Sequence, residues 1–176
     1  FSDLFYAKLD RKGEWSKPEL VDESEVINTK GNEGQSVFNS RFNRMYFTRC
    51  FTSVDSPSGC LILVAKRSGR SWETPEVLEL GSDSSMVVGH PAISEDEKTL
   101  IFAGEFERGF GGKDLYIATR ESVLEPFGRP RNLGPLVNTS RDEMFPFLRN
   151  DTSLYFSSNG LVRLGGLDIY RVTIKM

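Results

Sequence analysis

Residues 157–170 read SSNGLVRLGGLDIY, a glycine-rich run that ends in an aspartate and an apolar stretch. The end of this run recurs along the chain, because the similar stretches DLFYA, LILVA, DLYIA and DIYRV begin at residues 3, 61, 114 and 168. The recurrence gives a period of about 55 residues, which is typical of repeat architectures. A proline three positions after an aromatic residue repeats with a similar spacing, at residues 18, 75 and 130.

Each repeat is predicted to contain four short strands. In the middle copy these are residues 89–94, 99–103, 114–119 and 130–134, and no window has the apolar spacing of an amphipathic helix. The second and third strands are apolar on both faces, which fits a sheet packed between two others, and the proline-bearing fourth strand fits an exposed edge. The pattern therefore predicts an all-β fold, a β-propeller of roughly three four-stranded antiparallel blades.

The whole chain is predicted to be one fragment of such a propeller. Residues 1–28 supply the outer strands of a first blade, residues 33–83 and 88–139 form two blades, and residues 142–176 form the inner three strands of a last blade. Propellers usually have about 4–8 blades. We therefore expect flanking sequence to close the ring, or two copies to form a homodimer edge to edge, since open strand edges pair readily.

Composition and charge exclude several kinds of partner. The net charge is −3 and the basic residues are scattered, so nothing resembles the basic stripe that follows nucleic-acid phosphates. No apolar run approaches the roughly 20 residues that a membrane helix needs. The chain opens on Phe1 without a basic leader, so any targeting signal or anchor is expected to lie outside it.

The glycine-rich runs are interpreted as hairpin joints between the second and third strands. Glycine supplies the positive φ that such a loop needs to return the chain to its sheet. A phosphate-binding loop would lead into a helix N-terminus instead, and an anion or metal loop is the alternative. The glycines concerned form two matching sets: Gly109, Gly111 and Gly112, and Gly160, Gly165 and Gly166.

Aspartates at the head of the third strand, Asp3, Asp114 and Asp168, could be ligands or catalytic acids. Their recurrence favours a structural role, in which they accept backbone N–H groups and stabilise the turn. The single histidine, His90, has no nucleophile motif such as Gly-x-Ser-x-Gly and too few possible co-ligands for zinc. We therefore predict no catalytic residue, no metal site and no cofactor.

Two cysteines lie at the end of the second strand and just before the third strand of the first full blade. A hairpin would bring Cys50 and Cys60 opposite each other, so a disulfide is predicted. Such a bond fits an oxidising compartment such as the periplasm. Two free thiols are the alternative.

One face of the propeller is predicted to carry the exposed loops. The second-to-third-strand loops and the links between blades emerge together there, and exposed aromatic and arginine side chains are the usual anchors of protein interfaces. The alternative is that these loops pack on one another or on further blades. The candidate binding residues are Phe106, Arg108, Phe110, Arg141, Asp142, Glu143 and Arg163.

Three stretches resemble a known repeat. SEDEK at residues 94–98, PRNLGPLVNT at 130–139 leading into DEMFP at 142–146, and the run at 157–170 are similar to the PD40 (WD40-like, TolB-type) β-propeller repeat. The resemblance extends to Bacteroidota periplasmic lipoproteins in which such blades precede an OmpA-like peptidoglycan-binding domain, and the PorE-like members of this group belong to the type IX secretion apparatus. It implies a periplasmic, outer-membrane-associated protein whose anchor lies outside this fragment.

Two function classes follow. The first is a non-enzymatic scaffold that binds partner proteins of the cell envelope, in a secretion or peptidoglycan-linked complex, as the resemblance implies. The second is a propeller that binds or hydrolyses glycans, in which channel-facing carboxylates such as Glu33, Asp142 and Glu143 would act as acid and base.

Overall fold

A computed structural model describes residues 2–22, 25–51, 59–80, 87–162 and 164–174. Every regular element in these ranges is a β-strand. Within the same ranges, no helix has the length and apolar character needed to cross a membrane.

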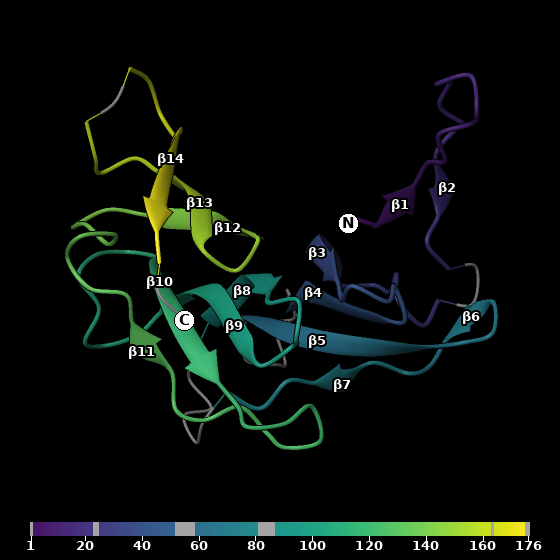
Figure 1. Cartoon of the computed structure of the whole chain (residues 1–176), viewed down its shortest axis with the longest axis horizontal. Helices are drawn as coiled ribbons and strands as arrows, with labels where there is room; N and C mark the ends of the chain where they lie inside the picture. The colour runs from purple at the N-terminus through teal and green to yellow at the C-terminus, as the bar shows by residue number, and fades with distance from the viewer. Residues whose placement is uncertain (1, 23–24, 52–58, 81–86, 163, 175–176) are drawn as a thin grey trace.

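The strands form four antiparallel sheets, labelled in Figure 1. A two-stranded ribbon contains β1 (Phe5–Tyr6) and β2 (Glu19–Leu20). The second sheet contains β3 (Asn32–Phe38), β4 (Arg44–Phe51), β5 (Gly59–Ser68), β6 (Ser71–Trp72) and β7 (Glu76–Val77), the last two both paired with β5. The third contains β8 (Val87–Ile93), β9 (Thr99–Glu105), β10 (Asp114–Thr119) and β11 (Arg131–Asn132). The fourth contains β12 (Glu143–Arg149), β13 (Ser153–Ser158) and β14 (Asp168–Thr173).

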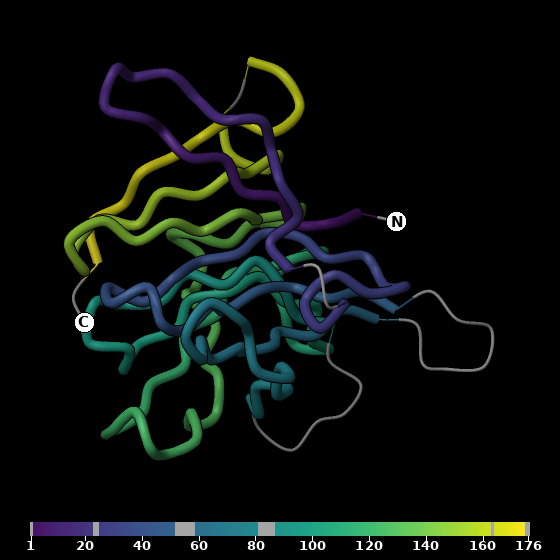
Figure 2. The backbone as a smooth tube through the Cα atoms, turned by 90° about the vertical axis from the view of Figure 1, so that its right-hand side faces the viewer, coloured from purple at the N-terminus to yellow at the C-terminus, as the bar shows by residue number. Residues whose placement is uncertain are grey.

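The sheets are arranged as blades around a common centre. The first strand of each of the three larger sheets faces that centre, and β8 lies against both β3 and β12. Figures 1 and 2 show the ribbon and the C-terminal sheet at the two ends of an arc, on the same side of the central sheets. The predicted all-β propeller is therefore confirmed. The three larger sheets span residues 32–77, 87–132 and 143–173, and the division of the chain into blades of one propeller fragment stays a prediction.

The core consists of three apolar layers between neighbouring sheets. Strand β9 shows how they arise, because successive side chains of a strand point to opposite faces. Leu100 and Phe102 enter the layer shared with the second sheet, whereas Ile101 and Ala103 enter the layer shared with the fourth. A third layer joins the ribbon to the second sheet. The apolar residues on both faces of the middle strands are thus explained by burial on both sides.

A β-bulge interrupts each of the three strands that face the common centre, which are β3, β8 and β12. The register shifts between Gly34 and Ser36 in β3, between Gly89 and Ala92 in β8, and between Met144 and Phe147 in β12. A bulge leaves an extra residue unpaired and redirects its side chain. In β8 and β12 the extra residues, at φ 53° and 54°, each precede a proline, and their rings stack across the centre of the arc, as described below.

The prediction that the loop glycines adopt positive φ is wrong. Among the described residues, the glycines with positive φ are Gly13, Gly69 and Gly134. Gly111 and Gly160 serve close approach instead, because a Cβ on Gly111 would overlap the backbone of residues 139–141, and a Cβ on Gly160 would overlap Thr139, whereas a Cβ on Gly165 or Gly166 would meet nothing within 4 Å. The loops are therefore hairpin joints, as predicted, and at Gly111 and Gly160 glycine is needed for packing against the link between blades.

Candidate functional site

A buried glutamate stabilises the link between the third and fourth sheets, residues 133–142. Glu143 is fully buried, and its Oε2 accepts the backbone N–H of Thr139 at 2.7 Å. Its Oε1 accepts the hydroxyls of Thr139 at 2.8 Å and Ser158 at 2.5 Å. Asn138, the residue before Thr139, forms two hydrogen bonds with the backbone of Leu115. Its Oδ1 accepts the N–H at 2.8 Å, and its Nδ2 donates to the carbonyl oxygen at 2.9 Å. Both carboxylate oxygens of Glu143 therefore accept hydrogen bonds that stabilise the link.

The same fastening occurs between the ribbon and the second sheet. The carboxylate of Glu33 accepts the hydroxyl of Thr29 at 2.8 Å and its N–H at 3.3 Å, and Asn28 brackets the backbone of Leu4 at 2.8 and 3.0 Å. Glu33 lies opposite Arg49 in the β3–β4 pair, whereas Glu143 lies opposite Ser158 in the β12–β13 pair. Arg49 Nε lies 2.7 Å from Glu33 Oε1, and the pair is almost completely buried. A sequence motif Asn-Thr followed four residues after the Thr by Glu marks both links.

Asp142 also stabilises a link. Its Oδ1 accepts the backbone N–H of Lys113 at 3.0 Å and its Oδ2 accepts Asn159 Nδ2 at 3.3 Å. Its own N–H donates to Asn159 Oδ1 at 2.9 Å. The three carboxylates of the glycan-hydrolysis hypothesis, Glu33, Asp142 and Glu143, are therefore all bound to neighbouring backbone or side-chain donors.

The aspartates at the head of the third strands hold the loops before them. Asp114 is fully buried and accepts the N–H of Phe110 at 2.5 Å and the amide of Asn132 at 2.8 Å. Asp168 accepts the N–H of Leu164 at 2.9 Å. These contacts are the structural role predicted for both aspartates.

Only part of the predicted binding face is exposed. Arg108, Phe110 and Arg141 reach the surface, with 48% of Phe110 accessible. Because Gly112 N–H donates to Arg141 O at 2.9 Å, the β9–β10 loop and the link lie against each other. Phe106 instead folds back and stacks on Tyr116, with ring centres 4.1 Å apart.

The remaining predicted binding residues contribute differently. Glu143 has no access to another molecule, Asp142 is partly buried, and Arg163 lies outside the described residues. The exposed set forms a surface that we call the loop face: Arg108, Phe110 and Arg141.

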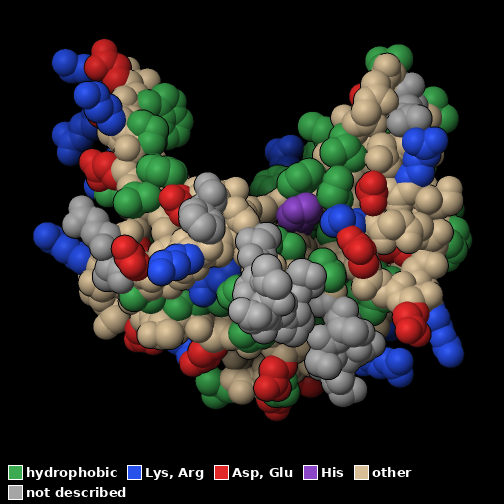
Figure 3. All heavy atoms as spheres, turned by 180° about the vertical axis from the view of Figure 1, so that it is seen from behind, with side chains coloured by type: hydrophobic (Ala, Val, Ile, Leu, Met, Phe, Trp, Pro, Cys, Tyr) green, Lys and Arg blue, Asp and Glu red, His purple; other side chains and the backbone are tan. Residues whose placement is uncertain are grey.

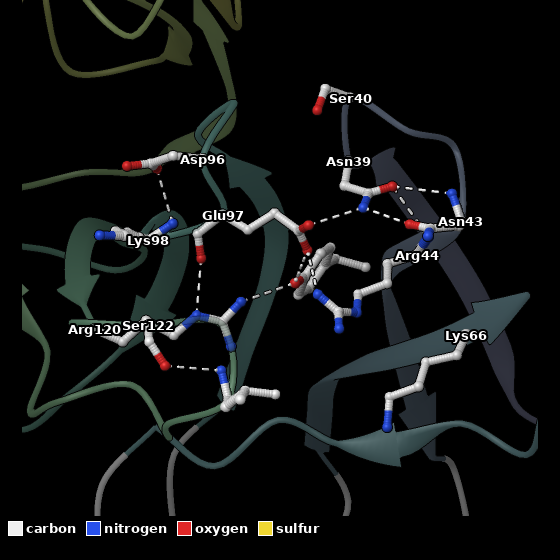
Figure 4. Close-up of polar contacts among 12 residues, drawn as sticks. Asn39, Ser40, Asn43, Arg44, Lys66, Asp96, Glu97, Lys98, Arg120 and Ser122 are labelled. Atoms are coloured by element: carbon white, nitrogen blue, oxygen red, sulfur yellow. Dashed lines mark hydrogen bonds and ion pairs between the residues drawn. The ribbon is translucent and has the colours of Figure 1, made fainter.

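At the opposite end of the strands, a polar network joins the second and third sheets (Figure 4). Glu97, in the β8–β9 turn, accepts Asn39 Nδ2 at 2.8 Å, the Tyr46 hydroxyl at 2.9 Å and Arg44 Nη1 at 3.1 Å. Arg120 closes the network, because its Nε donates to Glu97 O at 2.8 Å and its Nη2 to the Tyr46 hydroxyl at 3.2 Å. The sequence pattern gave no signal for this network, because its members come from three separate segments.

The network shifts the pKa values of its members. Burial raises the pKa of Tyr46 to about 12, and the neighbouring Glu97 carboxylate adds to the rise. Burial acts to raise the pKa of Glu97 too, but hydrogen bonds from Asn39, Tyr46 and Arg44 outweigh it and hold that pKa below its ordinary value. The network therefore contains a charged carboxylate and a neutral phenol over the physiological range.

Cys50 and Cys60 face each other across β4 and β5 and form a disulfide, with an S–S distance of 1.98 Å. The bond lies one residue pair before the end of the β4–β5 ladder, where Phe51 pairs with Gly59.

A groove of about 350 Å³ runs along the central strands β3, β8 and β12. Phe145, from the β12 bulge, lines it, and His90, from the β8 bulge, stacks on Phe145 with ring centres 4.2 Å apart. Gln35 Nε2 reaches across to Pro146 O at 3.3 Å. Figure 3 shows the histidine in purple at the floor of the hollow between the two ends of the arc.

His90 is held neutral in this position. Burial lowers its pKa from 6.5 to about 4, and the positive charge of Lys113 contributes. Among the described residues, His90 has no hydrogen-bond partner for its buried Nδ1, and no three His, Cys, Asp or Glu side chains gather as a metal site would require. The dipeptides His90-Pro91 and Phe145-Pro146, 55 positions apart, were the sequence signal for this pair of bulges.

Comparison with known proteins supports the fold alone. No family model and no curated protein matches the chain. The structure of TolB from Acinetobacter baumannii is similar, with a TM-score of 0.56 and 15% identity over 95% of this chain and 34% of TolB. A thermostable family-43 glycoside hydrolase matches with a TM-score of 0.61 and 10% identity over 97% of this chain and 67% of that one. The chain thus spans about a third of the length of TolB.

Proposed function

We propose that this chain is a non-enzymatic β-propeller module that binds a partner protein of the cell envelope through its loop face. One observation carries the proposal: the acids that sequence analysis offered for catalysis hold the links between blades. A general acid or base must exchange protons with a substrate, and Glu33 and Glu143 are buried with their carboxylates bound to neighbouring donors.

The loop face has the chemistry of a protein-binding surface. Two arginines and a phenylalanine project from segments that are themselves fastened, since Asp114 holds the backbone of Phe110 and the fastened link carries Arg141. Arginine and aromatic side chains dominate the binding energy of many protein interfaces. Their rigid support lowers the entropy cost of binding.

A periplasmic setting agrees with the disulfide, because such bonds persist in oxidising compartments. The resemblance to the PD40 repeat of OmpA-like lipoproteins points the same way. We therefore place the module in an outer-membrane-associated complex, linked to type IX secretion or to peptidoglycan.

A glycan-binding propeller is the second candidate, and the central groove favours it. Phe145 and Phe147 expose aromatic surface there, which is a common platform for sugar rings. The likeness to a family-43 glycoside hydrolase is at 10% identity and concerns the fold.

Site-specific photo-crosslinking in intact cells tests the first candidate. A photoreactive residue at position 110 is expected to capture a defined envelope protein, and Arg141→Glu is expected to abolish that product. Leu124, which is 93% exposed in the β10–β11 loop at the other end of β10, is the matched control position. The same products from positions 110 and 124, or capture that survives Arg141→Glu, would contradict the proposal.

A further inference from the structure

A second pocket lies between the ribbon and the second sheet, away from the loop face. It has a volume of about 300 Å³ and forms where β1, the β3–β4 turn and the β5–β6 hairpin meet. The ring centre of Phe38 lies 5.9 Å from those of both Phe42 and Trp72. These three rings make an aromatic wall, and we name the whole site the ribbon pocket.

Three cations share the ribbon pocket with these rings. Lys8 Nζ lies 5.1 Å from the ring centre of Tyr6, and the guanidinium of Arg67 lies 5.7 Å from the ring of Trp72, while Arg70 completes the set. Within the described part of the chain, none of the three cations forms an ion pair, and no carboxylate lines the pocket. The pocket is therefore locally positive in a chain of net charge −3.

The chemistry of the lining selects the ligand. The cations are donors only, the rings are apolar, and the Tyr6 hydroxyl is engaged with the carboxylate of Glu19. A neutral sugar presents hydroxyls that both donate and accept, so it would find few acceptors here. Carboxylates, by contrast, pair with arginine in a bidentate manner, and an apolar side chain packs on aromatic rings.

We propose that the ribbon pocket binds an acidic peptide segment of another protein. One apolar side chain of that segment lies against the aromatic wall, and flanking carboxylates pair with the three cations. The volume is at the lower end for ligand pockets, which suits a single side chain and its neighbours. This contact goes beyond the proposed function, because it lies at the end of the β3–β4 hairpin remote from the loops that carry Arg108 and Phe110.

Tryptophan fluorescence supplies the test. The chain has two tryptophans, so a Trp15→Phe background leaves Trp72 as the reporter. The probes are a capped Asp-Glu-Phe-Glu-Asp peptide and its amide counterpart, Asn-Gln-Phe-Gln-Asn. The acidic peptide is expected to bind at least about tenfold more tightly than the amide peptide and to weaken as salt rises.

Variants identify the site. Arg67→Gln/Arg70→Gln is expected to lower the affinity for the acidic peptide about tenfold or more, whereas Arg67→Lys/Arg70→Lys retains part of it. Arg129→Gln/Arg131→Gln, which removes two exposed charges near β11, is the matched control and should bind as the parent does. Circular dichroism establishes that each variant is folded.

Three outcomes would overturn the proposal. Equal affinity for the acidic and amide peptides does so on the unmodified pocket, without relying on any variant. Unchanged binding in Arg67→Gln/Arg70→Gln, with folding intact, does so as well. A third arm uses vesicles that contain phosphatidylglycerol: retention on these vesicles with no peptide binding, lost in the glutamine variant, would assign the ribbon pocket to an anionic headgroup.

Discussion

The hydroxyl of Tyr46 donates to the carboxylate of Glu97 at 2.9 Å, across the boundary between the second and third sheets. The two residues are separated by 51 positions in the chain. Apolar packing between blades is not directional, whereas this hydrogen bond has a defined geometry. The contact therefore helps to fix the orientation of the second sheet relative to the third. The relative positions of the loops on these two sheets depend on that orientation.

Removal of Glu97 should destabilise the fold. Glu97→Ala leaves Arg44 and Tyr46 without their shared acceptor, and we expect a loss of about 2–4 kcal/mol in the free energy of unfolding. Urea denaturation measures it. Glu95→Ala, in the same turn but exposed, is the control and should cost less than about 0.5 kcal/mol. Equal losses in the two variants would show that the network contributes little.

The raised pKa of Tyr46 predicts a loss of stability in alkali. The folded state binds the phenol proton more tightly than the unfolded state, with a pKa of about 12 instead of 10. The stabilisation is thus fully present below about pH 10 and is lost as the pH rises toward 12. Tyr46→Phe should show a shallower decline over this window in urea titrations. Parallel curves for the two proteins would contradict the assignment.

The opposite sign applies to His90. Its pKa falls from 6.5 to about 4 on folding, so its contribution is fully present above about pH 6.5 and is lost as the pH falls toward 4. The chain has a single histidine, so its ring protons give one titration curve by NMR. Phe145→Ala should raise the midpoint by admitting water to the ring. A midpoint near 6.5 in the parent protein would show that the ring is solvated.

Glycine in the β9–β10 loop should be required for space and not for backbone conformation. Gly111→Ala forces a Cβ against the backbone of the link at residues 139–141, and we expect a loss of about 1–3 kcal/mol by urea denaturation. Gly165→Ala is the matched control, because nothing lies within 4 Å of its added Cβ. If the two substitutions cost the same, the close approach is not what selects glycine.

The repeat period predicted most of the fold, because the same strand pairing and the same burial pattern recur in each repeat. The β3–β4 turn reads NSRFN at residues 39–43, where the β8–β9 turn reads SEDEK at residues 94–98, yet the backbone hydrogen bond is the same. Phe42 N–H donates to Asn39 O, and Glu97 N–H donates to Ser94 O, both at 3.0 Å. The roles of the acids were harder to predict. Glu143 was read as a channel or surface acid, although the repeated Asn-Thr motif before it was the available signal for a structural role.

The ribbon pocket could not be predicted from the repeat. Its cations and rings come from the ribbon, the β3–β4 turn and the β5–β6 hairpin, which are different parts of the repeat. Sites of this kind depend on how unlike segments meet in space. Periodicity in one sequence describes only what the copies share.

Glycan turnover by the purified chain and by its Glu143→Gln variant is the most direct measurement of the central claim, that the buried acids hold the blades together and do no chemistry. With cell-envelope glycans as substrates, we expect no turnover from either protein. The variant should instead have a lower melting temperature, because an amide cannot accept all the donors that Glu143 accepts. Turnover by the parent chain that is lost in Glu143→Gln, with the melting temperature unchanged, would contradict the account.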